Sequence, residues 1–147
     1  MTGETYRILL AEDDRFLRKA AETTLKRSGF EVTTATDGEE ALRAVGTCNP
    51  HLVLLDLIMP KIQGFEVLRS IKADPATAAI PVIVLSNLGQ ERDVQRAMEG
   101  GAVAYRIKAN LSLDDLVKQV KQVLGLEAAP VPAAVAEEPR VGKWAKP

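Results

Sequence analysis

Short apolar runs alternate along this chain with stretches in which apolar residues recur at every third or fourth position. A short apolar run bounded by turn residues is typical of a buried β-strand, whereas the wider spacing is typical of an amphipathic helix. Five runs therefore predict five strands: Tyr6–Ala11, Glu31–Ala35, His51–Leu55, Ile80–Leu85 and Val103–Ile107. Two helical stripes are clearest, one of Phe16, Leu17, Ala20, Ala21, Thr24 and Leu25, the other of Leu113, Leu116, Val117, Val120, Val123 and Leu124.

Turn and capping residues fall at the boundaries of these segments. Gly29 follows the first helical stretch, Asp37-Gly38 and Gly64 open the second and third, and Gly100-Gly101 closes the fourth. Ser112 is the expected N-cap of the fifth helix. The resulting (βα)5 alternation predicts an α/β fold with a doubly wound, parallel five-stranded sheet of the flavodoxin-like type. Order 2-1-3-4-5 is a common solution for five strands.

The chain divides into an expected domain, residues 1–126, and an expected tail, residues 127–147. Six Ala and four Pro among these last 21 residues leave few large side chains to bury and disfavour regular structure, so we expect a flexible or polyproline-like tail. For Trp144, a chance exposed aromatic is favoured over a docking anchor.

Composition and charge limit the cellular locations and the binding partners that can be expected. Hydrophobic residues make up 46% of the chain and charged residues 27%, as in ordinary globular proteins. Nineteen basic residues nearly balance twenty acidic ones, which disfavours binding to nucleic acid or to an anionic membrane. Cys48 has no second cysteine to pair with, and no secretion signal or membrane span is evident. A cytoplasmic protein is therefore expected.

Polar residues stand where four of the predicted strands end. They are Glu12-Asp13-Asp14 after the first strand, Asp56 after the third, Ser86 after the fourth and Lys108 after the fifth. In an open α/β sheet, ligands bind outside the carboxyl ends of the strands near the topological switch point. With order 2-1-3-4-5 these strands are consecutive neighbours, so the four sites should line one crevice.

Each of these residues also has a purely structural interpretation. Asp14 or Asp13 could cap a helix, Asp56 could belong to a turn, Ser86 to an ordinary loop, and Lys108 could be a solvated surface residue. Their joint position at four strand ends favours a functional site over four separate coincidences.

The residue types suit phosphoryl chemistry assisted by a metal ion. Magnesium prefers oxygen ligands and uses one or two carboxylates together with a phosphate oxygen, and Asp13 and Asp56 can supply the carboxylates. A carboxylate nucleophile can accept a phosphoryl group as an acyl phosphate while cations stabilise the equatorial oxygens. Lys108 and Ser86 fit the stabilising roles.

The sequence resembles the response-regulator receiver family over about residues 6–125. The matching segments are Ile8-Leu9-Leu10-Ala11-Glu12-Asp13-Asp14, Leu54-Leu55-Asp56-Leu57-Ile58-Met59-Pro60 with Gly64, Val84-Leu85-Ser86, and Gly101-Ala102 leading through Tyr105 to Lys108. The resemblance implies a two-component signalling protein, here a stand-alone one. It would take a phosphoryl group from a sensor histidine kinase or phosphotransfer protein and would catalyse only its own phosphoryl transfer and dephosphorylation.

The resemblance also implies a role for each matching position. Asp56 is the phospho-acceptor, Asp13 a direct magnesium ligand, Glu12 an acidic neighbour acting through water, and Met59 a ligand through its backbone carbonyl. Ser86 and Lys108 contact the phosphoryl group, and Tyr105 is the switch aromatic that turns inward when Ser86 moves toward the phosphate. The expected output is contact with a downstream protein, by a monomer that can dimerise when phosphorylated.

Two positions depart from the family pattern. Lys108 is followed by Ala109, whereas the family commonly has a proline there with a cis peptide. A cis bond before a non-proline residue costs about 2.5–4 kcal/mol, so either surrounding contacts retain it or the bond is trans and the loop differs. Asn87 stands where the family favours a small residue, and it could narrow access to the site.

Three other functions compete with this prediction. A haloacid-dehalogenase-type phosphatase needs a second acid two residues after the nucleophile, where this chain has Ile58. A flavin-binding protein needs a glycine- and hydroxyl-rich phosphate loop, whereas Glu12-Asp13-Asp14 would repel phosphate. The main alternative is a receiver-fold interaction module that works without phosphorylation. His51 is not an expected phosphoryl carrier, because it begins an apolar strand.

Overall fold

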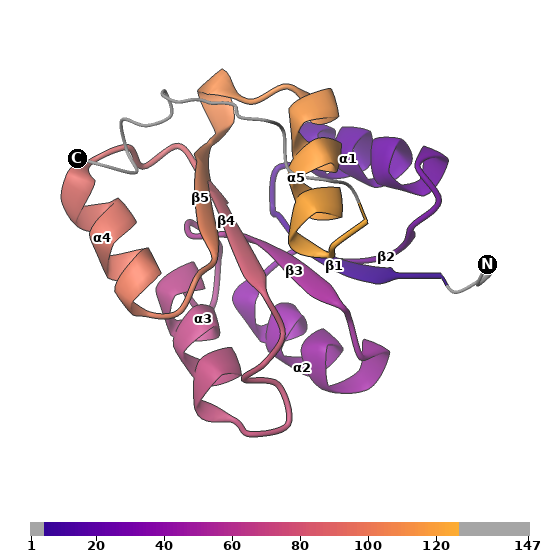
Figure 1. Cartoon of the computed structure of the whole chain (residues 1–147). Coiled ribbons are helices and arrows are strands. Elements are labelled where there is room, and N and C mark those ends of the chain that lie inside the picture. The colour runs from indigo at the N-terminus through magenta and orange to yellow at the C-terminus, as the bar shows by residue number, and fades with distance from the viewer. Residues whose placement is uncertain (1–4, 127–147) are drawn as a thin grey trace.

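The computed structural model describes residues 5–126, which form one central sheet covered by helices on both faces (Figure 1). The strands are β1 (Arg7–Ala11), β2 (Glu31–Ala35), β3 (Leu52–Asp56), β4 (Val82–Ser86) and β5 (Ala104–Ile107). The helices are α1 (Arg15–Arg27), α2 (Gly38–Cys48), α3 (Gly64–Ala73), α4 (Glu91–Glu99), α5 (Leu113–Val123) and the short 3-10 helix η1 (Lys108–Asn110).

The sheet is parallel throughout, with strand order β2-β1-β3-β4-β5. Helices α1 and α5 pack on one face, and α2, α3 and α4 pack on the other. Every residue of β3 and β4 is buried because helices cover both of their faces. The predicted α/β class and strand order are therefore confirmed.

The predicted helix boundaries rest on local hydrogen bonds. Asp37 caps α2 through the Glu40 N–H at 2.8 Å, and Ser112 caps α5 through the Asp115 N–H at 3.0 Å. Gly29 and Gly101 have the left-handed φ values of 98° and 111° that favour glycine after a helix. Local capping chemistry thus sets where the helices begin and end, as predicted.

Helix α1 differs from its predicted apolar stripe. Ala21 and Leu25 are buried, but Ala20 is exposed and 89% of Phe16 is exposed to solvent. The sheet and α5 cover only one side of this helix, and Phe16 lies outside that side, next to the half-buried Leu17. Assigning Phe16 to the core stripe was wrong, because helical spacing gives the periodicity but not the width of the buried face.

The bounds of β2 are those predicted, whereas one or both bounds of the other four strands shift by one or two residues. Asp56 and Ser86 are the last residues of β3 and β4 and not the first residues after them. The predicted tail, with Trp144, lies outside the described residues. Within residues 5–126, each helix is too short or too polar to cross a membrane.

Candidate functional site

Sheet register brings the four predicted polar sites to one edge. Ala11 pairs with Leu55, so Glu12 and Asp56 leave neighbouring strands at the same level. Asp56 pairs with Leu85, and Ser86 pairs with Ile107, which precedes Lys108. The polar positions therefore rise by one residue from Asp56 to Ser86 and by one more to Lys108, and they follow one another along the carboxyl edge.

Lys108 joins residues that lie far apart in the sequence. Its ammonium donates to Asp56 Oδ2 at 3.0 Å and to Glu12 Oε2 at 2.9 Å. Glu12 and Asp56 are almost fully buried, with exposed fractions of 0% and 3%. A partly buried ammonium between two buried carboxylates lowers their mutual repulsion, which makes Lys108 the cationic centre of the site.

Burial changes the proton affinity of all three groups. It raises the pKa of Glu12 from its ordinary 4.5 to about 7. The hydrogen bond from Lys108 opposes this rise, and the negative charge of Asp56 adds to it. Burial likewise raises the pKa of Asp56, opposed by hydrogen bonds from the Ile58 N–H and Lys108. Burial alone would lower the pKa of Lys108, but its hydrogen bonds to Glu12 and Asp56 raise it, so the side chain stays an ammonium.

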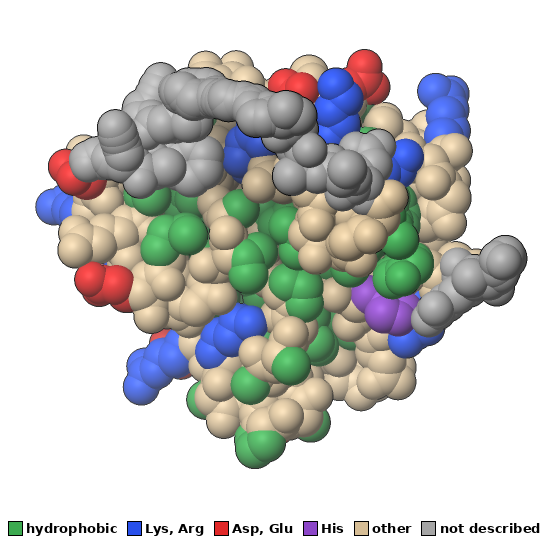
Figure 2. Space-filling model, in the orientation of Figure 1, with side chains coloured by type: hydrophobic (Ala, Val, Ile, Leu, Met, Phe, Trp, Pro, Cys, Tyr) green, Lys and Arg blue, Asp and Glu red, His purple; other side chains and the backbone are tan. Residues whose placement is uncertain are grey.

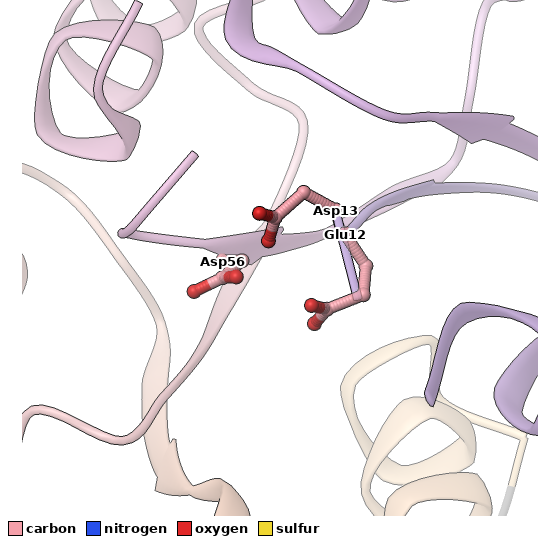
Figure 3. A group of neighbouring side chains, drawn as sticks. All are labelled: Glu12, Asp13 and Asp56. Carbon is pink, nitrogen blue, oxygen red and sulfur yellow. The ribbon is translucent and has the colours of Figure 1, made fainter. Parts of the chain in front are cut away.

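The carboxylates of Glu12, Asp13 and Asp56 lie near one another at the ends of β1 and β3 (Figure 3). One oxygen each from Glu12, Asp13 and Asp56 lies within 4.8 Å of the other two. Asp13 is exposed, in contrast to its two neighbours. Glu12 Oε1 is buried and accepts no hydrogen bond from the described residues, but the Lys108 ammonium lies 2.9 Å from it. An all-oxygen donor set fits a hydrated Mg²⁺ ion, because magnesium prefers oxygen ligands and keeps several of its waters when carboxylates bind it.

Asp14 differs in role from its neighbour Asp13. Its Oδ1 accepts from the N–H groups of Phe16 and Leu17 at 2.9 and 3.2 Å, which makes it the N-cap of α1. Its own N–H donates to Glu12 Oε2 at 3.0 Å. The structural interpretation of Asp14 is therefore confirmed, whereas Asp13 is free to serve the carboxylate cluster.

The loop after β3 turns back tightly over the acceptor aspartate. Asp56 Oδ1 accepts from the Ile58 N–H at 3.1 Å, and the Gly64 N–H closes the loop on the Leu57 carbonyl at 2.9 Å. A Cβ on Gly64 would lie 2.3 Å from the Asp56 carbonyl oxygen, so only glycine fits. The Met59 side chain is buried in the core, which anchors the middle of this loop.

Ser86 and Tyr105 meet the loop between β4 and α4. The Leu88 N–H donates to Ser86 Oγ at 3.0 Å, and the Tyr105 hydroxyl donates to the Leu88 carbonyl at 2.6 Å. Both side chains have an exposed fraction of 0%, and burial raises the pKa of Tyr105. Tyr105 thus occupies an inward position in which its hydroxyl holds the loop that follows Ser86.

A mostly apolar hollow of about 170 Å³ opens beside the acceptor loop. Ile58, Leu88 and Phe65 line it, together with Leu57, Met59, Gln63 and Arg96. The Arg96 guanidinium lies 3.9 Å from the centre of the Phe65 ring, a cation–π contact. Sequence reasoning did not find this contact, because Phe65 and Arg96 come from different helices and carry no local signal.

The two departures from the family pattern have different structural outcomes. Among residues 5–126 every peptide bond is trans, including the bond after Lys108. The chain continues from Lys108 into η1, which makes the trans alternative correct. Asn87 is exposed, so its side chain is not part of the buried cluster.

Comparison with known proteins identifies the family. The family model for the response regulator receiver domain matches residues 8–121. The chain belongs to this family. Receiver domains of two-component systems are typically phosphorylated on an aspartate, bind Mg²⁺ at an acidic pocket, and interact with histidine kinases or phosphotransfer proteins.

Relatives of this receiver domain share its sequence over most of the chain. A gliding motility regulatory protein of Myxococcus xanthus is 38% identical over 80% of this chain but only 15% of its own length. The probable transcriptional regulator ycf27 of Cyanophora paradoxa is 36% identical over 80% of this chain and 48% of its own length. The chain thus spans half or less of these curated relatives, and a stand-alone domain without a nucleic-acid partner stays a prediction.

Solved receiver domains share the fold at lower identity. The receiver domain of the Francisella response regulator 1452 superposes with a TM-score of 0.76 at 27% identity, over 82% of this chain and 98% of that one. Vibrio cholerae chemotaxis protein CheY4 gives a TM-score of 0.76 at 25% identity, over 82% of this chain and 99% of that one. These two solved chains are matched almost over their full length.

Proposed function

We propose that this receiver domain accepts a phosphoryl group on Asp56 from a histidine kinase or phosphotransfer protein, in a magnesium-dependent reaction. The observation that carries the proposal is the Lys108 ammonium, 3.0 Å from Asp56 Oδ2, beside a cluster of three carboxylates. An ion pair between Lys108 and Asp56 alone would not need the two further carboxylates of Glu12 and Asp13, one buried and one exposed.

The chemistry assigns a separate task to each group. A carboxylate oxygen of Asp56 attacks phosphorus, a P–O bond forms, the P–N bond of phosphohistidine breaks, and its electron pair leaves with the imidazole. The Ile58 N–H orients the Asp56 carboxylate before the attack. Lys108 remains an ammonium and moves to the incoming phosphoryl oxygens, and the Ser86 hydroxyl, which now accepts from Leu88, becomes their donor.

The metal site would be built from Asp13, Asp56 and the Met59 carbonyl, with Glu12 acting through water. Bound Mg²⁺ would neutralise charge on the transferring phosphoryl oxygens and would offset repulsion among the carboxylates. Asp13 is the exposed member of the cluster, so it can take up the ion at the solvent side without further desolvation.

The proposed output is a contact with a downstream protein through α4, β5 and α5. Apolar side chains gather between α4 and α5 on this face (Figure 2). Met98 in α4 and Val103, which directly precedes β5, have exposed fractions of 40% and 47%. If Ser86 turns toward a phosphoryl group, it releases the Leu88 N–H, and the loop that Tyr105 holds can change position.

The proposal is tested by intact-mass analysis after incubation with Mg²⁺ and acetyl phosphate. Wild-type protein should gain the mass of one phosphoryl group, and chelation of the metal or Asp56→Asn should abolish the gain. Asp14→Asn is the matched control, since it removes a neighbouring charge but keeps a residue that caps a helix well. No gain with several phosphoryl donors, or equal labelling of Asp56→Asn, would refute the proposal and favour the phosphorylation-independent interaction module.

A further inference from the structure

The start of α2 lies directly against the loop that follows the acceptor aspartate. The Gly38 N–H donates to the Pro60 carbonyl at 3.2 Å, and the Ile62 N–H donates to the same carbonyl at 2.9 Å. A Cβ on Gly38 would lie 1.9 Å from the Ile62 carbonyl oxygen and 2.7 Å from its carbonyl carbon. These are backbone atoms, so a side chain at position 38 could fit only if the whole loop moved.

Lys61 makes charged contacts with the residues on both sides of Gly38. Lys61 has a left-handed φ of 71°, and its ammonium lies 3.6 Å from Asp37 Oδ2 and 3.7 Å from Glu39 Oε1. Asp37 also caps α2, and the hydrogen bond from the Glu40 N–H is the largest cause that lowers its pKa. Because the Lys61 side chain is 60% exposed, solvent screens these contacts, and the close backbone packing at Gly38 is the stronger constraint.

This junction sits next to the proposed metal ligand. Met59 immediately precedes Pro60, whose carbonyl receives both hydrogen bonds. The other end of the loop is closed by the Gly64 N–H on the Leu57 carbonyl. The backbone at Met59 is therefore held between two fixed points, one on α3 and one on α2.

We propose that Gly38 is a positioning residue for the metal side of the acceptor site, acting through the loop that carries the Met59 carbonyl. The inference rests on the proposed function. Helix α2 contributes no side chain to the carboxylate cluster of Glu12, Asp13 and Asp56, yet its first residue sets where the loop backbone lies. Groups that orient metal ligands without touching the metal commonly change affinity by about 10- to 100-fold when they are altered.

The experiment compares Mg²⁺ affinity in Gly38→Ala and Gly46→Ala by following amide chemical shifts during a magnesium titration. Gly46 lies in the same helix, and a Cβ there would meet no atom within 4 Å, which makes it the matched control. We expect about 10-fold weaker binding in Gly38→Ala and wild-type binding in Gly46→Ala. Phosphorylation of Gly38→Ala by acetyl phosphate should be slow at low magnesium and should recover at saturating magnesium, which a general folding defect would not do.

A second measurement uses only the wild type and so does not depend on whether Gly38→Ala folds. The Gly38 amide resonance should shift with the same midpoint as that of Met59 during the titration, while the Gly46 amide stays in place. A Gly38 amide that ignores magnesium, or a folded Gly38→Ala that binds magnesium like the wild type, would overturn the inference. The proposed function fails separately, if the wild type itself gains no phosphoryl mass.

Discussion

Glu12 has no solvent exposure, and this burial dominates its proton affinity. Its Oε2 accepts hydrogen bonds from the Asp14 N–H and from Lys108, whose ammonium also lies 2.9 Å from Oε1. Burial is the largest cause that raises its pKa to about 7. Between its ordinary pKa of 4.5 and about 7, this group therefore holds a proton that a solvated glutamate would have released.

This raised pKa predicts how stability depends on pH in the metal-free protein. The stabilising contribution of protonated Glu12 is complete below its unfolded pKa of 4.5 and is lost as the pH rises through about 7. With a chelator present, the urea midpoint of the wild type should fall relative to that of Glu12→Gln between about pH 5 and about pH 8. A difference between the two proteins that stays constant with pH would contradict this assignment.

Ile58 and Leu88 predict a long-lived phosphorylated state. Both line the hollow beside the acceptor loop, and neither side chain can hold a water molecule by hydrogen bonding. Phospho-Asp56 should therefore lose its phosphoryl group more slowly in the wild type than in Ile58→Asn/Leu88→Glu, at fixed magnesium and pH. The decay is followed by intact mass, and the Ile58→Val/Leu88→Ile protein serves as an apolar control. Equal or slower decay in the polar double variant would remove the shielding argument.

At the scale of elements, two side-chain hydrogen bonds hold the loop between β4 and α4. The Tyr105 hydroxyl and the Ser86 hydroxyl each bond to Leu88, and α4 buries only Val94 and Ala97. A helix with so narrow a buried face can shift at low cost. The side chain of Tyr105, from β5, therefore acts as a tether for an element that follows β4.

Removing this tether should loosen the connection without changing the carboxylate cluster. Tyr105→Phe leaves the Leu88 carbonyl without its hydroxyl donor, which should cost about 1–3 kcal/mol of unfolding free energy. Amide exchange should quicken between residues 88 and 93 and stay unchanged in α1. Tyr6→Phe removes the same group from the opposite end of the sheet and is the control. If both variants change exchange in the same segments, the tether has no specific role.

At the scale of the whole molecule, the sheet connects the acceptor site to a surface on another side. The site occupies the carboxyl edge of β1, β3, β4 and β5, whereas the proposed output face consists of α4, β5 and α5. Ser86 and Tyr105 lie between the two, on adjacent strands. A change at the edge can therefore reach this face through two side chains.

Phosphorylation should consequently alter the α4–β5–α5 face more than any other surface. Amide exchange measured with and without acetyl phosphate should change in α4, in β5 and at the start of α5. Light scattering on the same samples tests whether a dimer forms. Asp56→Asn treated in the same way should show neither change. Exchange that changes only around α1 would refute the choice of output face.

Local patterns in the sequence determined the fold class, the capping residues and the polar character of the strand ends. These properties depend on spacing and on neighbours a few positions away, as at Ser112 and Asp37, so a single chain displays them directly. The strand order and the receiver resemblance then grouped Asp13, Asp56, Ser86 and Lys108 at one edge. That much of the candidate site was predictable.

Only the tertiary structure decided how these groups meet. Lys108 contacts Glu12 and Asp56 across 96 and 52 sequence positions, and those distances depend on register and loop path. The burial that raises the pKa of Glu12, the solvent exposure of Phe16 and the contact between Gly38 and Ile62 likewise depend on how helices pack around the sheet. Hydrophobic periodicity indicates which residues of an element share a face. Long-range packing determines which atoms cover that face and how closely they approach.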